Sequence, residues 1–240
     1  MQSRPEEVQG RPKAIIAPHA GYIYSGPVAA SAYALLQPLR GTIRRVVLLG
    51  PVHRTWTPGL ALPDVDAFDT PLGSIPIDRE AFAAIADLPQ VTVHPAAHAE
   101  EHSLEVQLPF LQETLDEFSL VPLAVGGASA EAVAEVLERL WGGEETLIVV
   151  SSDLSHYLPY AAAVATDRAT LAEILDLHTD LVGEEACGAH PINGLLLAAQ
   201  RHDLTPHLLD YRNSGDTAGD KSRVVGYAAI AFTEMAQHGD

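Results

Sequence analysis

The sequence predicts an α/β fold in which helices pack on a layered, largely parallel or mixed β-sheet. Three short apolar runs, at 14–17, 46–49 and 147–150, have the continuous hydrophobicity of strands buried on both faces. Each run is followed directly by Pro, Gly or Ser, where the backbone can turn, and segments with helical spacing lie between the runs. Strands that alternate with helices are typical of this fold class and place functional groups at the strand-to-helix turns.

Two further strands are predicted at 121–125 and 224–232. Pro122 has no N–H for a β-ladder, so the first of these strands is expected near an edge of the sheet. The stretch 68–78 carries prolines and a glycine and interrupts the alternation of strands and helices. We expect it to form a hairpin.

Apolar residues at helical spacing predict four helices, at 104–115, 129–140, 164–175 and 191–199. Ser129 is expected to cap its helix, because its side chain can accept a hydrogen bond from a free N–H of the first turn. Pro109 should kink or shorten the helix at 104–115. Pro191 suits the first turn of the last helix.

The chain has 240 residues, which favours one domain over residues 1–240, with the polar residues 1–13 loosely held. Its net charge of -18, from 32 acidic against 14 basic residues, disfavours binding to nucleic acid or to an anionic membrane. No apolar run approaches the roughly 20 residues of a membrane helix. A single cysteine excludes an internal disulfide and favours a cytoplasmic location.

Two histidines occupy equivalent places after the buried strands. His19 follows the first strand and His53 follows the second. Because the carboxyl ends of parallel strands meet at one edge of a sheet, we expect these imidazoles to converge. Two imidazoles at one edge are a natural beginning for a transition-metal site, since neutral imidazole is a common metal ligand.

Cys187 precedes the helix that contains Pro191. A helix N-terminus favours the thiolate form and should lower the pKa of the thiol. A thiolate can be a metal ligand or a nucleophile, and an inert buried cysteine is equally common. The residue pattern leaves these three interpretations open.

The third buried strand is followed by Asp153 and His156. The functional interpretation is that His156 transfers a proton while Asp153 orients a neighbouring imidazole, and the alternative is that Asp153 only caps a helix. Glu101 and His102 open the helix at 104–115, either as a pair that supports the site or as exposed first-turn charges.

A polar loop is expected at 211–216, before the last strand, either as a surface turn or as a flap over the site. Arg212, Lys221 and Arg223 are unusual in so acidic a chain and are candidates to meet an anionic substrate group. The remaining histidines without a supporting pattern are expected on the solvated surface, and they are His94, His98, His178, His202, His207 and His238.

Taken together, these segments resemble the MEMO family. The matching pieces are Ala17-Pro18-His19-Ala20-Gly21-Tyr22, Gly50-Pro51-Val52-His53, Glu101-His102-Ser103-Leu104-Glu105, Ser151-Ser152-Asp153-Leu154-Ser155-His156, Cys187-Gly188-Ala189-His190-Pro191, Asn213-Ser214-Gly215-Asp216 and Val225-Gly226-Tyr227. They follow one another in the family's order and cover most of the chain. Two features depart from the family's usual pattern: no Ala-Gly-aromatic-Tyr stretch precedes Ala14, and Val52 stands where Ser is common.

The resemblance implies a three-layer α/β/α fold around a central sheet, similar to class III extradiol dioxygenases. It also implies a metal site, with iron or copper favoured and zinc as a further option, and a functional link to a radical-SAM protein. The implied site residues are His19, His53 and Cys187 as metal ligands, His156 and Asp153 as catalytic residues, and Tyr22, Glu101, His102 and Arg212 as substrate contacts.

On this basis the sequence predicts a metal-dependent redox or oxygenase-like protein that acts on a small-molecule or peptide substrate. A thiolate ligand is softer than the carboxylate of the dioxygenases, which shifts the preference toward copper or zinc. Two alternatives stay open. One is a metal-independent hydrolase or transferase with Cys187 as its nucleophile. The other is a non-enzymatic module that binds a peptide or another ligand.

Overall fold

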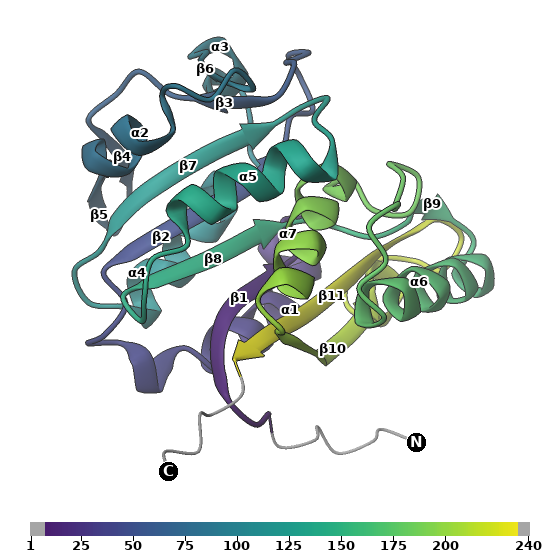
Figure 1. Cartoon of the computed structure of the whole chain (residues 1–240). Helices are drawn as coiled ribbons and strands as arrows, with labels where there is room; N and C mark the ends of the chain where they lie inside the picture. The colour runs from purple at the N-terminus through teal and green to yellow at the C-terminus, as the bar shows by residue number, and fades with distance from the viewer. Residues whose placement is uncertain (1–7, 235–240) are drawn as a thin grey trace.

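The mixed sheet at the centre of the fold carries helices on both faces (Figure 1). The structure is a computed structural model, and it describes residues 8–234. The strands are β1 (Arg11–Ala17), β2 (Arg45–Pro51), β3 (Leu60–Leu62), β4 (Ala67–Thr70), β5 (Gly73–Pro76), β6 (Val91–Val93), β7 (Ser119–Val125), β8 (Thr146–Ser151), β9 (His156–Leu158), β10 (Thr205–Asn213) and β11 (Val224–Glu234).

Figure 1 shows α5 and α7 together over one face of the sheet and α1 and α4 on the opposite face, which gives the predicted three layers. The helices are α1 (Tyr22–Ala34), α2 (Arg79–Ile85), α3 (Ala96–Ala99), α4 (Leu108–Thr114), α5 (Ala130–Leu140), α6 (Tyr160–Leu175) and α7 (Ala189–Arg201), with 3₁₀ turns at Gln37–Leu39, Glu105–Gln107 and Ser214–Asp216. Within residues 8–234, no helix combines the length and apolar character needed to cross a bilayer.

The sheet has the order β10-β11-β1-β8-β2-β7-β3-β6, and β9 adds to β11. The three strands predicted to be buried on both faces, β1, β8 and β2, are parallel neighbours. Their register aligns Ala17 with Ser151 and Leu49 with Val150. The turns after these strands therefore lie at one edge of the sheet, as the sequence predicted.

Strand β7 lies inside the sheet, so the prediction of an edge position for Pro122 was wrong. The proline aligns with Leu48 of β2 on one side. On its other side the short strand β3 pairs only with Ala124 and Val125, and Leu120 forms a bridge with Ile77. Pro122 therefore faces a gap in the ladder where no N–H is required.

The predicted helices and the hairpin are present. Ser129 accepts a hydrogen bond from the backbone N–H of Ala132 at 3.2 Å and so caps α5. Pro109 lies in the first turn of α4 after a 3₁₀ turn, so it starts a short helix where a longer one was predicted. Pro191 lies in the first turn of α7. Strands β4 and β5 form the hairpin expected at 68–78.

Two features differ from the sequence prediction. Strand β1 already begins at Arg11, and the side chain of Lys13 is buried, so residues 11–13 are held firmly. Residues 1–7, the rest of the expected loose terminus, are outside the described part of the chain. The segment 211–216 is not one loop, because its first half ends the long strand β10 and its second half is a 3₁₀ turn.

Candidate metal centre

His19 lies two residues beyond β1 and is almost completely buried, with 2% of its surface exposed. Asp153, two residues beyond the neighbouring strand β8, fixes the loop that carries it. The carboxylate oxygen Oδ1 of Asp153 accepts hydrogen bonds from the backbone N–H groups of His19 at 2.9 Å and Ala20 at 3.3 Å. The parallel pairing of the two strands thus sets the position of the imidazole.

The hydrogen bonds around Ser151 determine which ring nitrogen of His19 is free. The Ser151 hydroxyl donates its proton to the carbonyl of Ser103 at 2.6 Å and accepts one from Gln107 Nε2 at 2.8 Å. Its remaining lone pair faces His19 Nδ1 at 2.9 Å, so Nδ1 must be the donor there. Nε2 of His19 therefore carries the lone pair that can bind a metal.

The imidazole of His19 is strongly biased toward the neutral form. Burial lowers its pKa, and the neighbouring rings of His53 and His102 lower it further, to about 3. A neutral imidazole is the form that binds metals. His19 is therefore ready to act as a ligand at any ordinary pH.

His53 lies two residues beyond β2, and Glu101 holds both its backbone and its ring. The Glu101 oxygen Oε2 accepts a hydrogen bond from the backbone N–H of His53 at 2.5 Å, and Oε1 lies 2.8 Å from His53 Nδ1. Because a carboxylate can only accept, Nδ1 of His53 carries the proton and Nε2 is left free. Carboxylate support of this kind is usual behind metal-binding histidines.

His102 is held by the same carboxylate. Oε1 of Glu101 accepts hydrogen bonds from the backbone N–H groups of His102 and Ser103, both at 2.9 Å, and it lies 3.3 Å from His102 Nδ1. Burial alone would raise the pKa of Glu101, but the hydrogen bonds from His53 and Ser103 outweigh it and lower the pKa to about 2. Glu101 is therefore an anion that orients two histidines at once.

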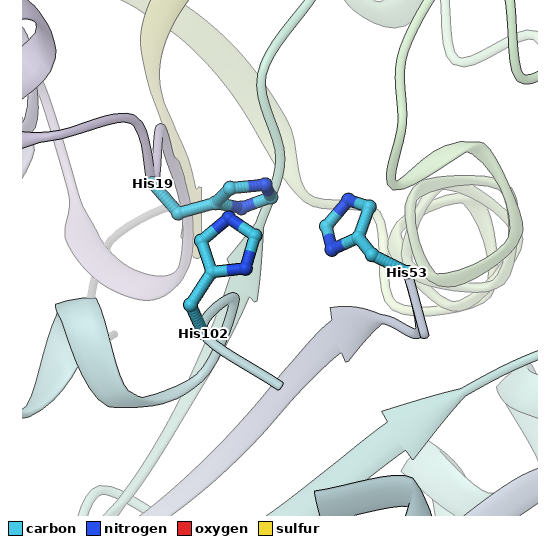
Figure 2. A group of neighbouring side chains, drawn as sticks. All are labelled: His19, His53 and His102. Atoms are coloured by element: carbon cyan, nitrogen blue, oxygen red, sulfur yellow. The ribbon is translucent and has the colours of Figure 1, made fainter. Parts of the chain in front are cut away.

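The three imidazoles converge on one point, as Figure 2 shows, and they come from three segments that are far apart in the sequence. One ligand nitrogen from each of His19, His53 and His102 lies within 4.8 Å of the other two, so the three residues can together hold a metal ion. The ring centroids are 5.0 to 5.4 Å apart. His53 and His102 are partly exposed, with 29% and 48% of their side-chain surfaces accessible, which leaves the site open on one side.

Cys187 lies beside His19, at the place where the sequence predicted a third ligand. Its Sγ is 3.4 Å from His19 Nε2 and accepts a hydrogen bond from the backbone N–H of Asp153 at 3.3 Å. The three-residue group defined above contains His102 where Cys187 was predicted. Burial, followed by the Asp153 carboxylate, raises the pKa of the Cys187 thiol to about 12, so the expected lowering by the helix N-terminus is outweighed.

The two predicted catalytic residues have different surroundings. Asp153 is buried and holds the backbone of the His19 loop, while its Oδ2 lies 3.9 Å from His19 Nε2. Burial raises its pKa. His156 begins the short strand β9 and is partly exposed, and its charge is near enough to influence the pKa of both His19 and Asp153.

The predicted substrate contacts do not all meet at the histidine group. Tyr22 begins α1 and is half-exposed, and its hydroxyl donates to the carbonyl of Val106 at 3.1 Å. The guanidinium of Arg212 pairs with Asp210 on the same strand at 2.9 Å. The other two basic candidates also contact neighbours, since Lys221 lies 4.4 Å above the ring of Tyr160 and Arg223 lies 5.0 Å above the ring of Tyr157.

Two of the histidines expected at the surface have structural roles. His98 donates from Nε2 to the carbonyl of Ala61 at 2.9 Å, and burial lowers its pKa. His202 stacks on the ring of Trp141 at a centroid distance of 3.7 Å. The prediction of a solvated surface position was therefore wrong for both, and a third histidine of that group, His207, is partly buried with Nε2 3.0 Å from the Thr233 hydroxyl oxygen. His238 is outside the described residues.

Two residues that support the site were not singled out from the sequence. Ser151 ends strand β8, so its place directly after a buried strand could have identified it. Gln107 donates from Nε2 to the carbonyl of Pro18 at 2.9 Å as well as to Ser151, and it accepts from the Tyr33 hydroxyl at 2.8 Å. No local pattern marks this glutamine, because its partners are distant in the sequence.

Comparison with known proteins points to one family. The family described as “Memo-like protein” matches residues 1–231. A “MEMO1 family protein” from Metallosphaera sedula is 36% identical over 91% of this chain and 82% of its own length, and one from Aquifex aeolicus is 38% identical over 92% and 86%. A crystal structure of an uncharacterised protein from Escherichia coli K12 aligns with a TM-score of 0.57, 16% identity, and coverage of 91% of this chain and 99% of its own. At that identity the likeness shows the fold alone.

Proposed function

The chain belongs to the MEMO family, and from that premise we propose that it is a transition-metal protein with a redox or oxygenase-like activity. The observation that carries this proposal is the convergence of His19, His53 and His102 within 4.8 Å. The Nδ1 atoms of His19 and His53 are hydrogen-bonded to Ser151 and Glu101, which leaves Nε2 of both rings available to a metal, and Nδ1 of His102 lies 3.3 Å from the same Glu101 carboxylate.

Cys187 is proposed as an additional ligand beside His19. Its Sγ already contacts the lone-pair nitrogen of that ring at 3.4 Å, so an ion bound to Nε2 would lie next to the sulfur. A bound cation stabilises thiolate, which offsets the burial that raises the thiol pKa to about 12. Imidazole nitrogen with one thiolate sulfur suits copper, iron or zinc, and the first two supply redox chemistry.

The residues around the group suggest how a substrate is handled. His19 is buried, whereas His53 and His102 are partly exposed, so a substrate would approach from the side of the latter two. His156 is proposed as the acid/base residue and Asp153 as the residue that fixes the His19 loop. Of the four predicted substrate contacts, Tyr22 stays a candidate, His102 is proposed as a metal ligand and Glu101 as its support, and Arg212 is engaged by Asp210.

The surroundings of Cys187 disfavour the alternative of a metal-independent nucleophile. A nucleophilic cysteine needs a lowered pKa, because the thiolate is the reactive form. Here burial and the Asp153 carboxylate raise that pKa to about 12. The imidazole nearest to the thiol, His19, has Nε2 3.4 Å from Sγ, and its own pKa of about 3 makes it a weak base.

The test is elemental analysis of the protein purified anaerobically, for the wild type and for the single variants His53→Ala, His102→Ala, Cys187→Ala and His156→Ala. Loss of His53 or His102 should remove most of the bound metal, because each supplies one of three converging nitrogens. Loss of Cys187 should weaken metal binding and change the visible spectrum if the ion is copper. His156→Ala should retain the metal and, once a substrate is known, lose turnover.

Two outcomes would overturn the proposal. Equal metal content in the wild type and in the His53 and His102 variants would show that the histidine group is not the metal site. Loss of metal from the His156 variant, with its fold intact by circular dichroism, would show that His156 is a ligand and that its proposed proton-transfer role is wrong.

A further inference from the structure

A cavity of about 730 Å³ lies between the β4–β5 hairpin, the segment around α3 and the start of α4. Its volume is within the range of roughly 300 to 1,000 Å³ that is usual for small-molecule sites. The lining residues include Glu101 but none of the three histidines of the metal group. The cavity therefore lies beside the metal group. It shares with that group the Glu101 carboxylate, which supports His53 and His102, and the segment 21–22 that follows His19.

The walls of the cavity are mostly apolar and come from several segments. Tyr22 and Phe68 contribute aromatic rings, and Val65, Leu104 and Leu108 contribute aliphatic groups. Four prolines, from 63, 71, 95 and 109, complete much of the lining. Proline backbones have few conformations to lose, so a ligand would find these walls largely formed.

Hydrogen bonds tie the hairpin wall to the helical wall. The Thr70 hydroxyl donates to Oε1 of Gln112 in α4 at 2.6 Å, and Nε2 of Gln112 donates to the carbonyl of Gly73 at 3.1 Å. Phe68 contacts the ring of His98 edge-on, with the centroids 6.2 Å apart. The two sides of the cavity are thus connected at the tip of the hairpin.

The charged residues that line the cavity are all acidic. Asp64, Asp69, Glu101 and Glu105 line the cavity, and its lining contains neither Lys nor Arg. His98 is the one lining residue that could become cationic near neutral pH, but burial lowers its pKa and its Nε2 proton is donated to a backbone carbonyl. An anionic ligand would therefore be repelled, whereas a neutral or cationic one would not.

We propose that this cavity binds a small neutral or cationic molecule with an aromatic or aliphatic body. Apolar walls supply the affinity, and the four carboxylates exclude anions of the same shape. The proposal does not depend on the metal, because the lining is complete without His19, His53 or His102.

Two fluorescent probes test this inference directly, since they share an aromatic body and differ by one sulfonate. N-phenyl-1-naphthylamine is neutral, and 1-anilinonaphthalene-8-sulfonate is anionic. Titration of the chelator-treated full chain should show saturable binding of the neutral probe and binding at least about tenfold weaker for the anion. Chelation keeps the result independent of the proposed metal function.

A matched pair of substitutions on α3 locates the binding. Ala99 lines the cavity and Ala96, on the same helix, does not, and both are exposed. Ala99→Trp should fill the space and weaken the neutral probe by about tenfold or more, whereas Ala96→Trp should change it by less than about twofold. The double substitution Asp69→Asn with Glu105→Gln leaves the walls unchanged and should strengthen binding of the anionic probe.

Three results would overturn the inference. One is equal affinity for the two probes in the wild type. Another is unchanged binding of the neutral probe to a folded Ala99→Trp variant. The third is a dimer, detected by light scattering, that Ala99→Trp converts to a monomer, because a second copy of the chain would then occupy the cavity.

Discussion

The two halves of the histidine group are supported in different ways. His19 is held from two directions, by the Ser151 hydroxyl at its ring and by the Asp153 carboxylate at its backbone. Both supporting residues belong to or directly follow β8, which pairs with β1 along its length. His53 and His102 instead share one support, the carboxylate of Glu101.

The site therefore has a rigid half, which is His19 and its loop, and an adjustable half, which is His53 and His102. His19 is buried against the end of the sheet, so its position is set by strand pairing as well as by side chains. The other two rings are partly exposed and lie on segments outside regular structure. One residue, Glu101, therefore supports two of the three rings, whereas loss of a single support should affect His19 less.

Among the residues that support the three rings, Glu101 should therefore show the largest effect on metal binding when it is substituted. Its two oxygens accept four hydrogen bonds, from the backbone and ring of His53 and from the backbone of His102 and Ser103. In Glu101→Gln one acceptor becomes a donor, and we expect metal affinity to fall by about 100-fold, the upper end for support residues. Competition with a chromogenic chelator measures the metal affinity of the wild type and the variant.

Glu105→Gln provides a control for the loss of one charge from the same segment. Glu105 is exposed and contacts none of the three rings through a hydrogen bond in the described part of the chain. Its substitution should leave metal affinity within about twofold of the wild type. If both variants lost affinity equally, general electrostatics would explain the effect and the support role of Glu101 would be wrong.

Ser151→Ala should lower the metal affinity less than Glu101→Gln does. It removes the acceptor for His19 Nδ1, but Asp153 continues to hold the backbone of that loop. We expect metal affinity to fall by about tenfold, the lower end for support residues. A loss as large as that of Glu101→Gln would contradict the distinction between a rigid and an adjustable half.

The sequence predicts well those parts of the site whose position follows directly from the end of a buried strand. Continuous apolar runs predict β1, β2 and β8, and the rule that parallel strands end at a common edge predicts that His19, His53 and Asp153 lie close together. These inferences succeed because they depend on strand pairing, which hydrophobicity encodes locally. The short strands β3, β6 and β9 carry too few residues for such a pattern.

The sequence does not predict which residues meet through irregular loops, as His102 shows. His102 was expected beside a substrate, and it joins the histidine group because Glu101, its neighbour in the chain, reaches across to the backbone of His53. The same limit applies to Gln107, which supports the loop of His19 through Ser151 and through the carbonyl of Pro18, both distant along the chain. Contacts of this kind depend on the path of a loop, and no local spacing of residue types predicts that path.

The amino end of β1 contains a second buried ionisable group, far along the strand from the histidine group. Lys13 is buried there, and its ammonium donates to the carbonyls of Trp141, Gly143 and Thr146 at 2.5, 2.9 and 3.1 Å. Burial lowers its pKa from 10.5 to about 8, against the opposing effect of nearby glutamates. Between these two pH values the unfolded chain holds this proton more tightly than the folded chain does.

The free energy of unfolding should therefore rise with pH between about 8 and 10.5, by at most about 1.4 kcal/mol per pH unit, the slope for one proton. Lys13→Met should remove this rise, while the buried tyrosines titrate equally in both proteins and cancel in the difference. Urea unfolding at several pH values measures the two slopes. If the wild type and Lys13→Met had equal slopes, the pKa of Lys13 would be the same in the folded and unfolded chains, although three carbonyls accept hydrogen bonds from its ammonium. Lys13 would then be held in place without a change in its pKa. His19, just beyond the other end of the same strand, is both held in place and shifted in pKa by burial, so the two effects would be shown to be separable.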